Sequence, residues 1–228
     1  MPEFYPYPRT PHLIGSDVAD DDRLISASDF QIMAKDHHIV AQEKVDGTNV
    51  GVYFEAQGEM VLQKRSGLFG TGEHAQYNAF RAWAFEHFHV LHKVVGEDLV
   101  LFGEWLWAEH GMHYDALPDF FLGFDLLAKV SHEFLATEQM AALCRGLVEM
   151  VPVLWNGPAS AMPALPELAN RSKFAPHPAE GVYLRVESGG RVIGRCKWRR
   201  PGFTCGRPDF ATRLRRNSLH NQNPGGGN

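Results

Sequence analysis

The sequence "EKVDGTNVGV", Glu43 to Val52, places a lysine, an aspartate, a glycine and an asparagine in close order. Runs rich in β-branched and aromatic residues lie on both sides, so both flanks are predicted to be strands. Lys44 is therefore expected at a strand end, just before a turn that contains Asp46 and Gly47. Because an Asp-Gly pair is a common turn signal, an ordinary surface lysine beside a β-turn is one interpretation.

The other interpretation is a lysine nucleophile. An amine attacks an electrophile only after losing its proton, and the ordinary lysine pKa of ~10.4 leaves well under 1% neutral at pH 7. Lowering the pKa to ~7–8 takes roughly 3.5–4.5 kcal/mol from desolvation or nearby cations. A reactive lysine therefore predicts cations that arrive from elsewhere in the chain, and the candidates are Arg65, Arg195, Lys197 and Arg199.

Three acidic residues lie in or beside apolar, strand-like runs. They are Glu104 in "LFGEWLW", Asp125 in "GFDLL" and Glu180 in "EGVYLRV". Buried acids are rarely left without a partner, so solvated faces explain these positions poorly. The sequence alone indicates that they could bind a divalent metal or a ribose.

The order of the predicted elements indicates an α+β domain of antiparallel sheets with flanking helices. Strands are expected at 39–45, 49–56, 59–65, 98–107 and 120–127, with a closing hairpin of 180–187 and 191–198. Helices are expected at 75–95 and at 137–150, where Thr137 would be the N-cap, and a short helical piece is expected near 165–170. The first thirty or so residues are predicted to be an extended arm, and 152–166 a proline-rich connector.

Composition narrows the class of protein. The 228 residues are 44% hydrophobic, which suits one globular domain, and no apolar run approaches the ~20 residues that span a bilayer. The N-terminus has no secretory signal pattern. The three cysteines form no CxxC pair, which favours reduced thiols in a cytoplasmic protein over a disulfide framework or a zinc site.

Charge is distributed unevenly. From Arg191 onward the chain has nine Lys or Arg residues and one acid, so this segment carries +8 and the remainder −13. A basic end with interleaved aromatics (Trp198, Phe203 and Phe210) favours contact with nucleic-acid phosphates, although a solvated basic tail is the plainer alternative.

In order, several segments resemble the nucleotidyltransferase motifs of ATP-dependent polynucleotide ligases and mRNA capping enzymes. "KVDGTN" resembles motif I, "RSG" the element after it, "FGEW" motif III, "FLGFDLL" motif IIIa, "EGVYLR" motif IV and "RCKW" motif V. The resemblance covers roughly Ile39 to Arg200. Within the superfamily the chain looks most like RNA ligases of the RNA ligase 2 type, which include the kinetoplastid editing ligases.

This resemblance implies a fold, a reaction and a cofactor. The fold would be an ATP-grasp-like nucleotidyltransferase domain. Lys44 would attack ATP to form lysyl-AMP, AMP would pass to an RNA 5′-phosphate, and a 3′-hydroxyl would displace it to seal nicked or broken RNA, as in RNA repair. The resemblance also implies Mg²⁺, with Mn²⁺ as a substitute.

The resemblance assigns roles residue by residue. Lys44 and Lys197 would be catalytic. The nucleotide would be contacted by Glu43, Val45, Asn49, Arg65, Glu104 (ribose), Phe124 (adenine), Glu180, Arg195 and Lys197 (α-phosphate). The metal or its water shell would be held by Glu180, Glu43 and Asp125. The segment "YPRTPHL", Tyr7 to Leu13, is expected to pack near the nucleotide, but the sequence supplies no physical reason for it.

Two departures from the family pattern matter. Motif V usually reads K-x-K, and Arg195 takes the first place here. The chain also ends about thirty residues after motif V, so neither an OB-fold nor another C-terminal domain is expected. The predicted organisation is an N-terminal arm at 1–38 packed on the domain, a nucleotidyltransferase core at 39–200, and a basic segment at 201–228 with a disordered tail.

Three alternatives stay open at this point. The chain could seal DNA or a DNA–RNA nick, since no side chain reports a sugar preference by sequence. It could also be a non-catalytic module that binds nucleic-acid ends. The basic segment from Arg199 to Arg216, or a protein partner, could take the place of the missing domain.

Overall fold

The computed structural model describes residues 2–18, 22–204 and 215–220. The chain divides into two compact units. Unit 1 comprises Met1–Tyr7, Gly47–Met150 and Gly206–Asn228, and unit 2 comprises Pro8–Asp46 and Val151–Cys205. The described part has the α+β class expected from the sequence, with most strands paired antiparallel.

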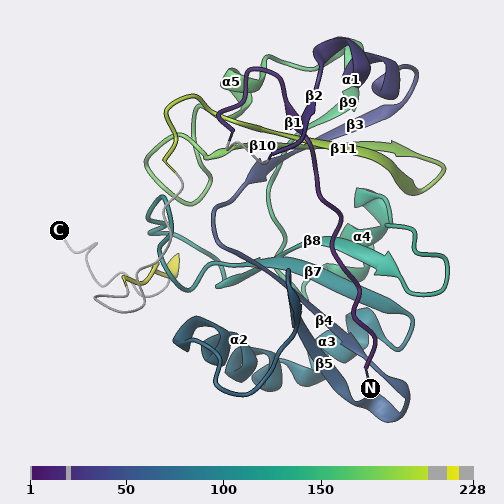
Figure 1. Cartoon of the computed structure of the whole chain (residues 1–228), viewed down its shortest axis with the longest axis vertical. Coiled ribbons are helices and arrows are strands. Elements are labelled where there is room, and N and C mark those ends of the chain that lie inside the picture. Colours follow the sequence, from purple (N-terminus) through teal and green to yellow (C-terminus); the bar gives the residue numbers. More distant parts are fainter. Residues whose placement is uncertain (1, 19–21, 205–214, 221–228) are drawn as a thin grey trace. The chain divides into compact units, whose positions relative to one another are not determined.

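Unit 2 contains a six-stranded sheet in the order β2-β1-β11-β10-β3-β9. Its strands are β1 (His12–Leu13), β2 (Leu24–Ile25), β3 (His38–Lys44), β9 (Val153–Pro158), β10 (Gly181–Ser188) and β11 (Arg191–Arg199). The strands from β11 to β9 are antiparallel neighbours, whereas β1 pairs in parallel with both β2 and β11. Helices α1 (Ala27–Ala34) and α5 (Leu165–Leu168) lie beyond the same face of this sheet (Figure 1).

The alternation of side chains along a strand sorts the residues of unit 2 onto two faces. One face is the apolar core, where Ile39 and Ala41 of β3, Val182, Leu184 and Val186 of β10, and Cys196 and Trp198 of β11 pack with Phe30 and Ala34 of α1. The opposite face therefore carries the intervening residues. On β3 these are Gln42 and Lys44, and on β11 Arg195, Lys197 and Arg199. In this way one face of the sheet collects charged residues of the motif I and motif V strands.

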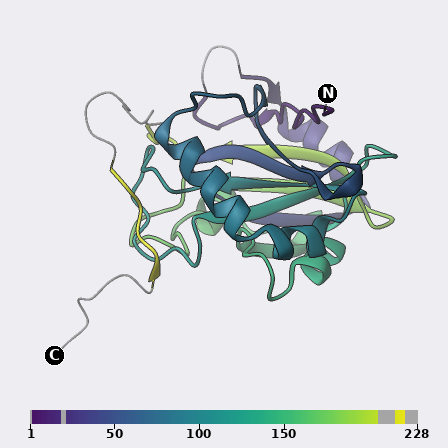
Figure 2. The ribbon, with the colours of Figure 1, turned by 90° about the horizontal axis from the view of Figure 1, so that it is seen from below.

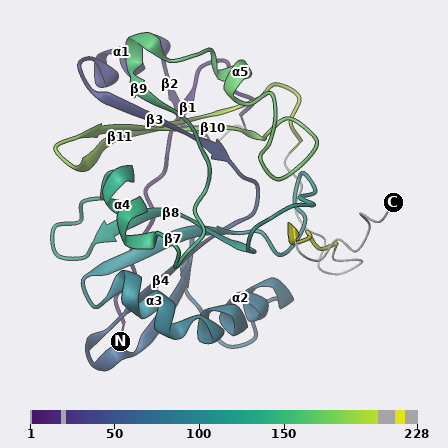
Figure 3. The same ribbon diagram turned by 180° about the vertical axis from the view of Figure 1, so that it is seen from behind.

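Unit 1 contains a five-stranded antiparallel sheet in the order β6-β5-β4-β7-β8. Its elements are β4 (Thr48–Phe54), the 3₁₀ turn η1 (Ala56–Gly58), β5 (Met60–Lys64), β6 (Gly67–Leu68), α2 (Ala75–Glu86), α3 (Phe88–Val95), β7 (Leu99–Trp105), β8 (Phe121–Ala128) and α4 (Thr137–Cys144). Helices α2 and α3 run across the strands of this sheet (Figure 2), and α4 packs against β8 (Figure 3).

Different segments of the chain cover the two faces of the unit 1 sheet. On one face, Phe54 of β4 meets Phe88 of α3 edge to face, with ring centroids 5.2 Å apart. The next residue back, Tyr53, points to the other face and meets Tyr5 of the N-terminal segment at 5.1 Å. The side chain of Gln63 accepts from the Tyr5 N–H at 3.2 Å and donates to the Tyr5 carbonyl at 2.6 Å. The start of the chain is thereby attached to this second face.

Several local predictions from the sequence were wrong. The single helix expected at 75–95 is divided at His87, whose Nδ1 lies 2.8 Å from the Trp83 carbonyl, four residues earlier, and whose ring stacks on Trp83. A side chain that bonds to the carbonyl four residues earlier disturbs helical geometry. The helix expected at 137–150 ends at Cys144, since Gly146 adopts a left-handed φ of 68°.

The ends of predicted elements also differ. Ala136, and not Thr137, occupies the N-cap position of α4. The proline-rich connector contains β9, which pairs with β3 at the sheet edge and ends at Pro158, where a missing N–H is tolerated. The segment expected to be an extended arm contains β1, β2 and the start of α1. The tail at 221–228 and most of the basic segment lie outside the described residues.

Close backbone approach makes Gly181 a sensitive position. A Cβ there would lie 1.9 Å from the carbonyl oxygen of Trp198, so Gly181→Ala requires two paired strands to move apart. We expect this change to lower the free energy of unfolding by roughly 1–3 kcal/mol or more, measured by urea denaturation. The matched control is Gly70→Ala, where the nearest atom is 3.8 Å away. Equal midpoints for the two variants would contradict the tight β10–β11 contact.

Candidate active site

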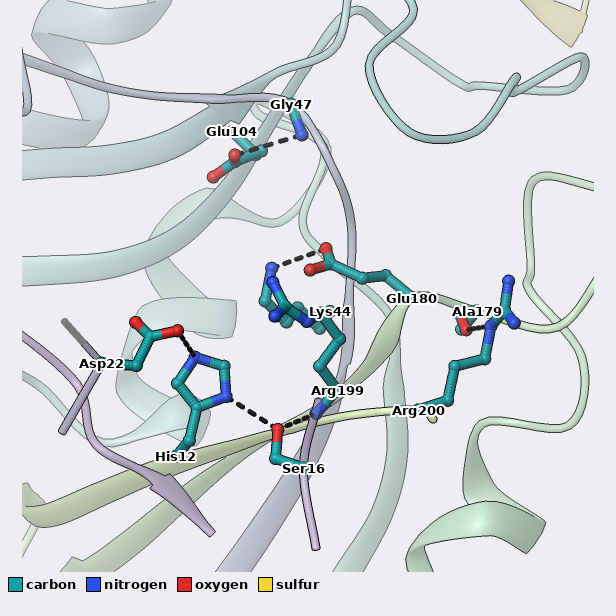
Figure 4. Close-up of polar contacts among 10 residues, drawn as sticks. All are labelled: His12, Ser16, Asp22, Lys44, Gly47, Glu104, Ala179, Glu180, Arg199 and Arg200. Carbon is teal, nitrogen blue, oxygen red and sulfur yellow. Dashed lines mark hydrogen bonds and ion pairs between the residues drawn. The ribbon is translucent and has the colours of Figure 1, made fainter. Parts of the chain in front are cut away.

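Lys44 is the last residue of β3 and lies on the polar face of the unit 2 sheet, opposite Gly181 of β10 in the ladder. Its Nζ is 2.5 Å from Oε2 of Glu180, the residue immediately before β10 (Figure 4). The side chain of Lys44 is 22% exposed and that of Glu180 only 2%. The β3–β10 register therefore brings the lysine of motif I to the glutamate of motif IV.

Glu180 is surrounded by charges of both signs. Burial raises the pKa of its carboxyl group, and the charge of Asp46 raises it further, whereas Lys44 and Arg199 lower it. The net direction is upward, so this carboxylate holds a proton more readily than an exposed glutamate does. Its backbone is also anchored, because the Arg200 N–H donates to the Glu180 carbonyl at 3.0 Å.

The motif V strand adds cations to the same face. Lys197 of β11 stands opposite Tyr183 of β10, which in turn stands opposite Gln42 of β3. Side chains paired across a ladder point to the same face, so Lys197 shares the face of Lys44, and Arg195 and Arg199 follow at two-residue spacing. Unit 2 thus brings Lys44 into contact with Glu180 and places Lys197 and Arg195 on the same sheet face, with Arg195 farther along β11.

Glu43 lies on the opposite, apolar face, because it neighbours Lys44 in a strand. It is 2% exposed, and its two oxygens accept from the Ser172 hydroxyl at 2.5 Å and from the Lys173 N–H at 2.9 Å. Burial raises the pKa of the Glu43 carboxyl group, and these two hydrogen bonds oppose the increase. Glu43 therefore holds the loop that leads to Glu180 by contacts on the core side of the sheet.

In unit 1, Glu104 of β7 stands opposite Asn49 of β4, so both side chains point to the same face. Glu104 Oε1 accepts from the Gly47 N–H at 3.2 Å. A Cβ on Gly47 would lie 2.6 Å from the carbonyl of Trp105, which explains the glycine by close approach of the chain to β7. The close packing of the chain against β7 is therefore sufficient to require a glycine at position 47.

Phe124 and Asp125 lie at a bulge in β8. Phe102 pairs with Asp125 and the following residue of β7 pairs with Gly123, so Phe124 is the additional residue on β8. A bulge redirects the side chains around it. Tyr7 packs edge to face against Phe124 at 5.2 Å and donates its hydroxyl to the buried Asp125 at 2.6 Å.

The two remaining predicted residues lie in connections. Val45 is buried directly after β3, and Arg65 is exposed in the turn between β5 and β6. Sequence reasoning did not identify Tyr7, Ser172 or His12 as residues of interest. The segment "YPRTPHL" was the only signal for two of them.

The described residues contain no cluster of side chains that could bind a metal ion without other ligands. Within residues 2–18, 22–204 and 215–220, no group of three or more His, Cys, Asp or Glu side chains could hold an ion. Mg²⁺ in phosphoryl-transfer sites is usually held by one or two carboxylates together with substrate phosphates and water. Among the helices that the structure describes, none combines the length and hydropathy needed to cross a membrane.

A family model described as RNA ligase matches residues 37–199, which is more than half of the chain. The chain belongs to the RNA ligase family. The matched range runs from the start of β3 to the end of β11 and contains all of the predicted site residues. A comparison with curated protein sequences finds no match.

Solved structures of Naegleria gruberi RNA ligase share the fold. A variant without ligand aligns with a TM-score of 0.52 at 17% identity, covering 73% of this chain and 50% of that one. A second variant, solved with ATP and Mn, aligns at 0.54 with 15% identity over 87% and 61% of the two chains. A third, solved with AMP and Mn, aligns at 0.53 with 16% identity over 86% and 62%. The chain thus spans between half and about three fifths of the length of these structures.

The contacts of Glu43 generate a stability prediction. In Glu43→Gln, only the amide oxygen can accept, and the amide NH₂ would face either Ser172 or the Lys173 N–H, which are donors. We expect a loss of about 1–3 kcal/mol in the free energy of unfolding, measured by urea denaturation. Glu86→Gln, at an exposed position, is the control for the same chemical change. An unchanged midpoint in Glu43→Gln would show that these hydrogen bonds contribute little.

Proposed function

We propose that this chain is an ATP-dependent RNA ligase that works through a Lys44–AMP intermediate. The observation that carries the proposal is the ion pair of Lys44 with the buried Glu180, on a sheet face that also carries Lys197. Such an amine has what a nucleophile requires, because it lies at a strand end with a proton acceptor in contact and cations around it.

The first step forms one bond to phosphorus and breaks another. Lys44 Nζ bonds to the α-phosphorus of ATP, the bond from that phosphorus to the bridging oxygen breaks, and pyrophosphate leaves. The amine must lose a proton, and Glu180 Oε2, 2.5 Å from Nζ, is suited to take it because burial raises its pKa. Lys197 would neutralise charge that develops on the α-phosphate.

Among the three carboxylates predicted to hold the metal, Glu180 is the best placed to bind Mg²⁺. Glu43 already accepts two hydrogen bonds on the core face, and Asp125 accepts one from Tyr7. Glu180 is a carboxylate on the polar face, and it would hold Mg²⁺ through the water shell of the ion, which leaves Oε2 able to take the proton of the amine. Bound there, the metal would supply positive charge to the triphosphate and help to lower the pKa of the amine.

Unit 1 would supply the nucleoside contacts. We propose that Glu104 and Asn49 bind the ribose, that Phe124 stacks on adenine, and that Arg65 contacts sugar or phosphate. The paired positions of Asn49 and Glu104 on one face support a shared ligand. The Naegleria gruberi structures solved with ATP and Mn support the use of a nucleotide and a divalent metal, and Mg²⁺ is our choice of ion.

The later steps would transfer AMP to an RNA 5′-phosphate and join it to a 3′-hydroxyl. We also propose a cytoplasmic location, in line with Cys144 and Cys196 being free thiols. A protein partner stays a prediction.

Covalent labelling tests the first step. Incubated with α-labelled ATP and Mg²⁺, the chain should gain one adenylate, and Lys44→Ala should gain none. Lys44→Arg is the control for charge, because a guanidinium keeps the cation but is always protonated. Label in Lys44→Ala at the level of the parent would overturn the proposal. Sealing of nicked duplexes that differ only in the sugar at the 3′-hydroxyl would then separate RNA from DNA ligation.

The basic end generates a prediction about RNA binding. Arg215 pairs with Glu109 at 3.1 Å, and the Arg216 guanidinium lies 4.3 Å from the Trp107 ring centroid, whereas Arg213 lies outside the described residues. Reversing all three to glutamate should weaken RNA binding at least tenfold at ~0.1 M salt and leave lysyl-AMP formation intact.

The control for this charge change is Lys93→Glu with Arg145→Glu, two exposed positions elsewhere in unit 1. Binding would be measured by fluorescence anisotropy across a range of salt concentrations. Equal loss in both variants would indicate a general charge effect, and no loss in either would exclude the basic end as an RNA contact.

A further inference from the structure

His12 lies near the end of the Tyr7–Leu13 segment, for which the sequence supplied no physical reason. It is the first residue of β1, 2% exposed, and it stands opposite Lys197 in a parallel ladder. The backbone joins the two strands directly, because the Lys197 N–H donates to the Pro11 carbonyl at 2.9 Å. Since paired residues share a face, the imidazole lies on the same face as Lys44, whereas Leu13 packs into the apolar core.

The two ring nitrogens have different neighbours (Figure 4). Nδ1 lies 2.7 Å from the Ser16 hydroxyl oxygen, and Nε2 lies 3.4 Å from Oδ2 of Asp22. The same Ser16 oxygen accepts from the Arg199 backbone N–H at 2.8 Å. One tautomer fits all three contacts, with a proton on Nε2 facing Asp22 and Nδ1 accepting from Ser16.

The charged groups around His12 come from β3, from β11 and from Asp22 in the connection before β2. Burial lowers the pKa of its imidazole to about 4, and Lys197, Arg199 and Lys44 lower it as well, whereas Asp22 raises it. His12 is thus a neutral ring among cations at neutral pH. Protonation of the ring would add a fourth cation there and remove the acceptor that Ser16 uses.

We infer that His12 is a positioning residue for the proposed adenylyl transfer. Through Ser16 it holds the Arg199 end of β11, and through the ladder it holds Lys197, so that both cations stay beside the Lys44–Glu180 pair. The inference rests on the proposed function. It also gives the "YPRTPHL" segment a physical role, because β1 and β2 extend the sheet past β11 and make the motif V strand an interior strand.

Single-turnover adenylylation of the lysine tests this inference, because its amplitude and its rate constant are measured separately. The amplitude of single-turnover labelling reports the fraction of chains that is folded and competent, and the rate constant reports how well the reacting groups are placed. In His12→Ala we expect near-complete amplitude with a rate constant reduced roughly tenfold to a hundredfold. His12→Asn keeps an acceptor near the Nδ1 position and should recover part of the rate.

The matched control is His89→Asn at an exposed position, which should label at the parent rate. A His12→Ala variant that labels at the parent rate overturns the inference alone. A variant that loses amplitude but keeps the rate constant shows a purely structural role and also overturns it. If the parent chain gains no label at all, the proposed function fails, and the inference fails with it.

The contacts of His12 can also be tested without an activity assay. Imidazole ¹⁵N chemical shifts should show His12 as the Nε2–H tautomer at pH 7 and still neutral at pH 5.5. In the folded chain the pKa of His12 is lowered from 6.5 to about 4, so the unfolded chain binds this proton more tightly. The free energy of unfolding should therefore decrease as the pH falls from 6.5 towards 4. A titration midpoint near 6.5 would contradict the buried network.

Discussion

The register of three neighbouring strands in unit 2 determines whether the charged residues can meet. Lys44 pairs with Gly181, Gln42 with Tyr183, and Tyr183 with Lys197. A shift of one residue along β3 would move Lys44 into the apolar core and bring Glu43 to the polar face, since side chains alternate with a period of two. The core side chains of β3, β10 and β11 prevent such a shift, because it would expose them.

The ion pair of Lys44 and Glu180 is a consequence of that register. Removing a carboxylate from water is costly, and a buried acid persists when a cation is in contact with it. Here the strand end brings the amine to the glutamate, and further cations on β11 face the same region. The arrangement keeps charged groups close together, and phosphoryl transfer requires preorganised charges of this kind.

The N-terminal segment contributes to both units by separate contacts. Tyr5 and Tyr7 bind the sheet of unit 1 through Gln63 and Asp125, and His12 joins the sheet of unit 2 beside Lys197. In each case a polar side chain of the segment or the sheet is buried with a partner. A buried polar group without a partner would cost about 1–3 kcal/mol, so these contacts give the segment a defined path.

Local pattern was sufficient for many elements. Runs rich in β-branched and apolar residues located β3, β4 and β5, near-continuous apolar runs located β7 and β8, and a Gly-Gly turn located the β10–β11 hairpin. Periodicity could not locate the break at His87, because apolar spacing continues through it and only the backbone conformation of that residue changes. It also could not identify β9, since a proline-rich stretch becomes a strand only when β3 offers it an edge.

Residue type and spacing were sufficient for the α+β class and for the order of the motif segments, and the resemblance to RNA ligases predicted Lys44 as the nucleophile. Only the tertiary structure decided that Glu43 faces the core while Lys44 faces Glu180, that Phe124 lies on a bulge, and that His12 stands beside Lys197. The physical reason is that strand register and ladder direction arise from contacts between residues far apart in the chain, and no local pattern contains them.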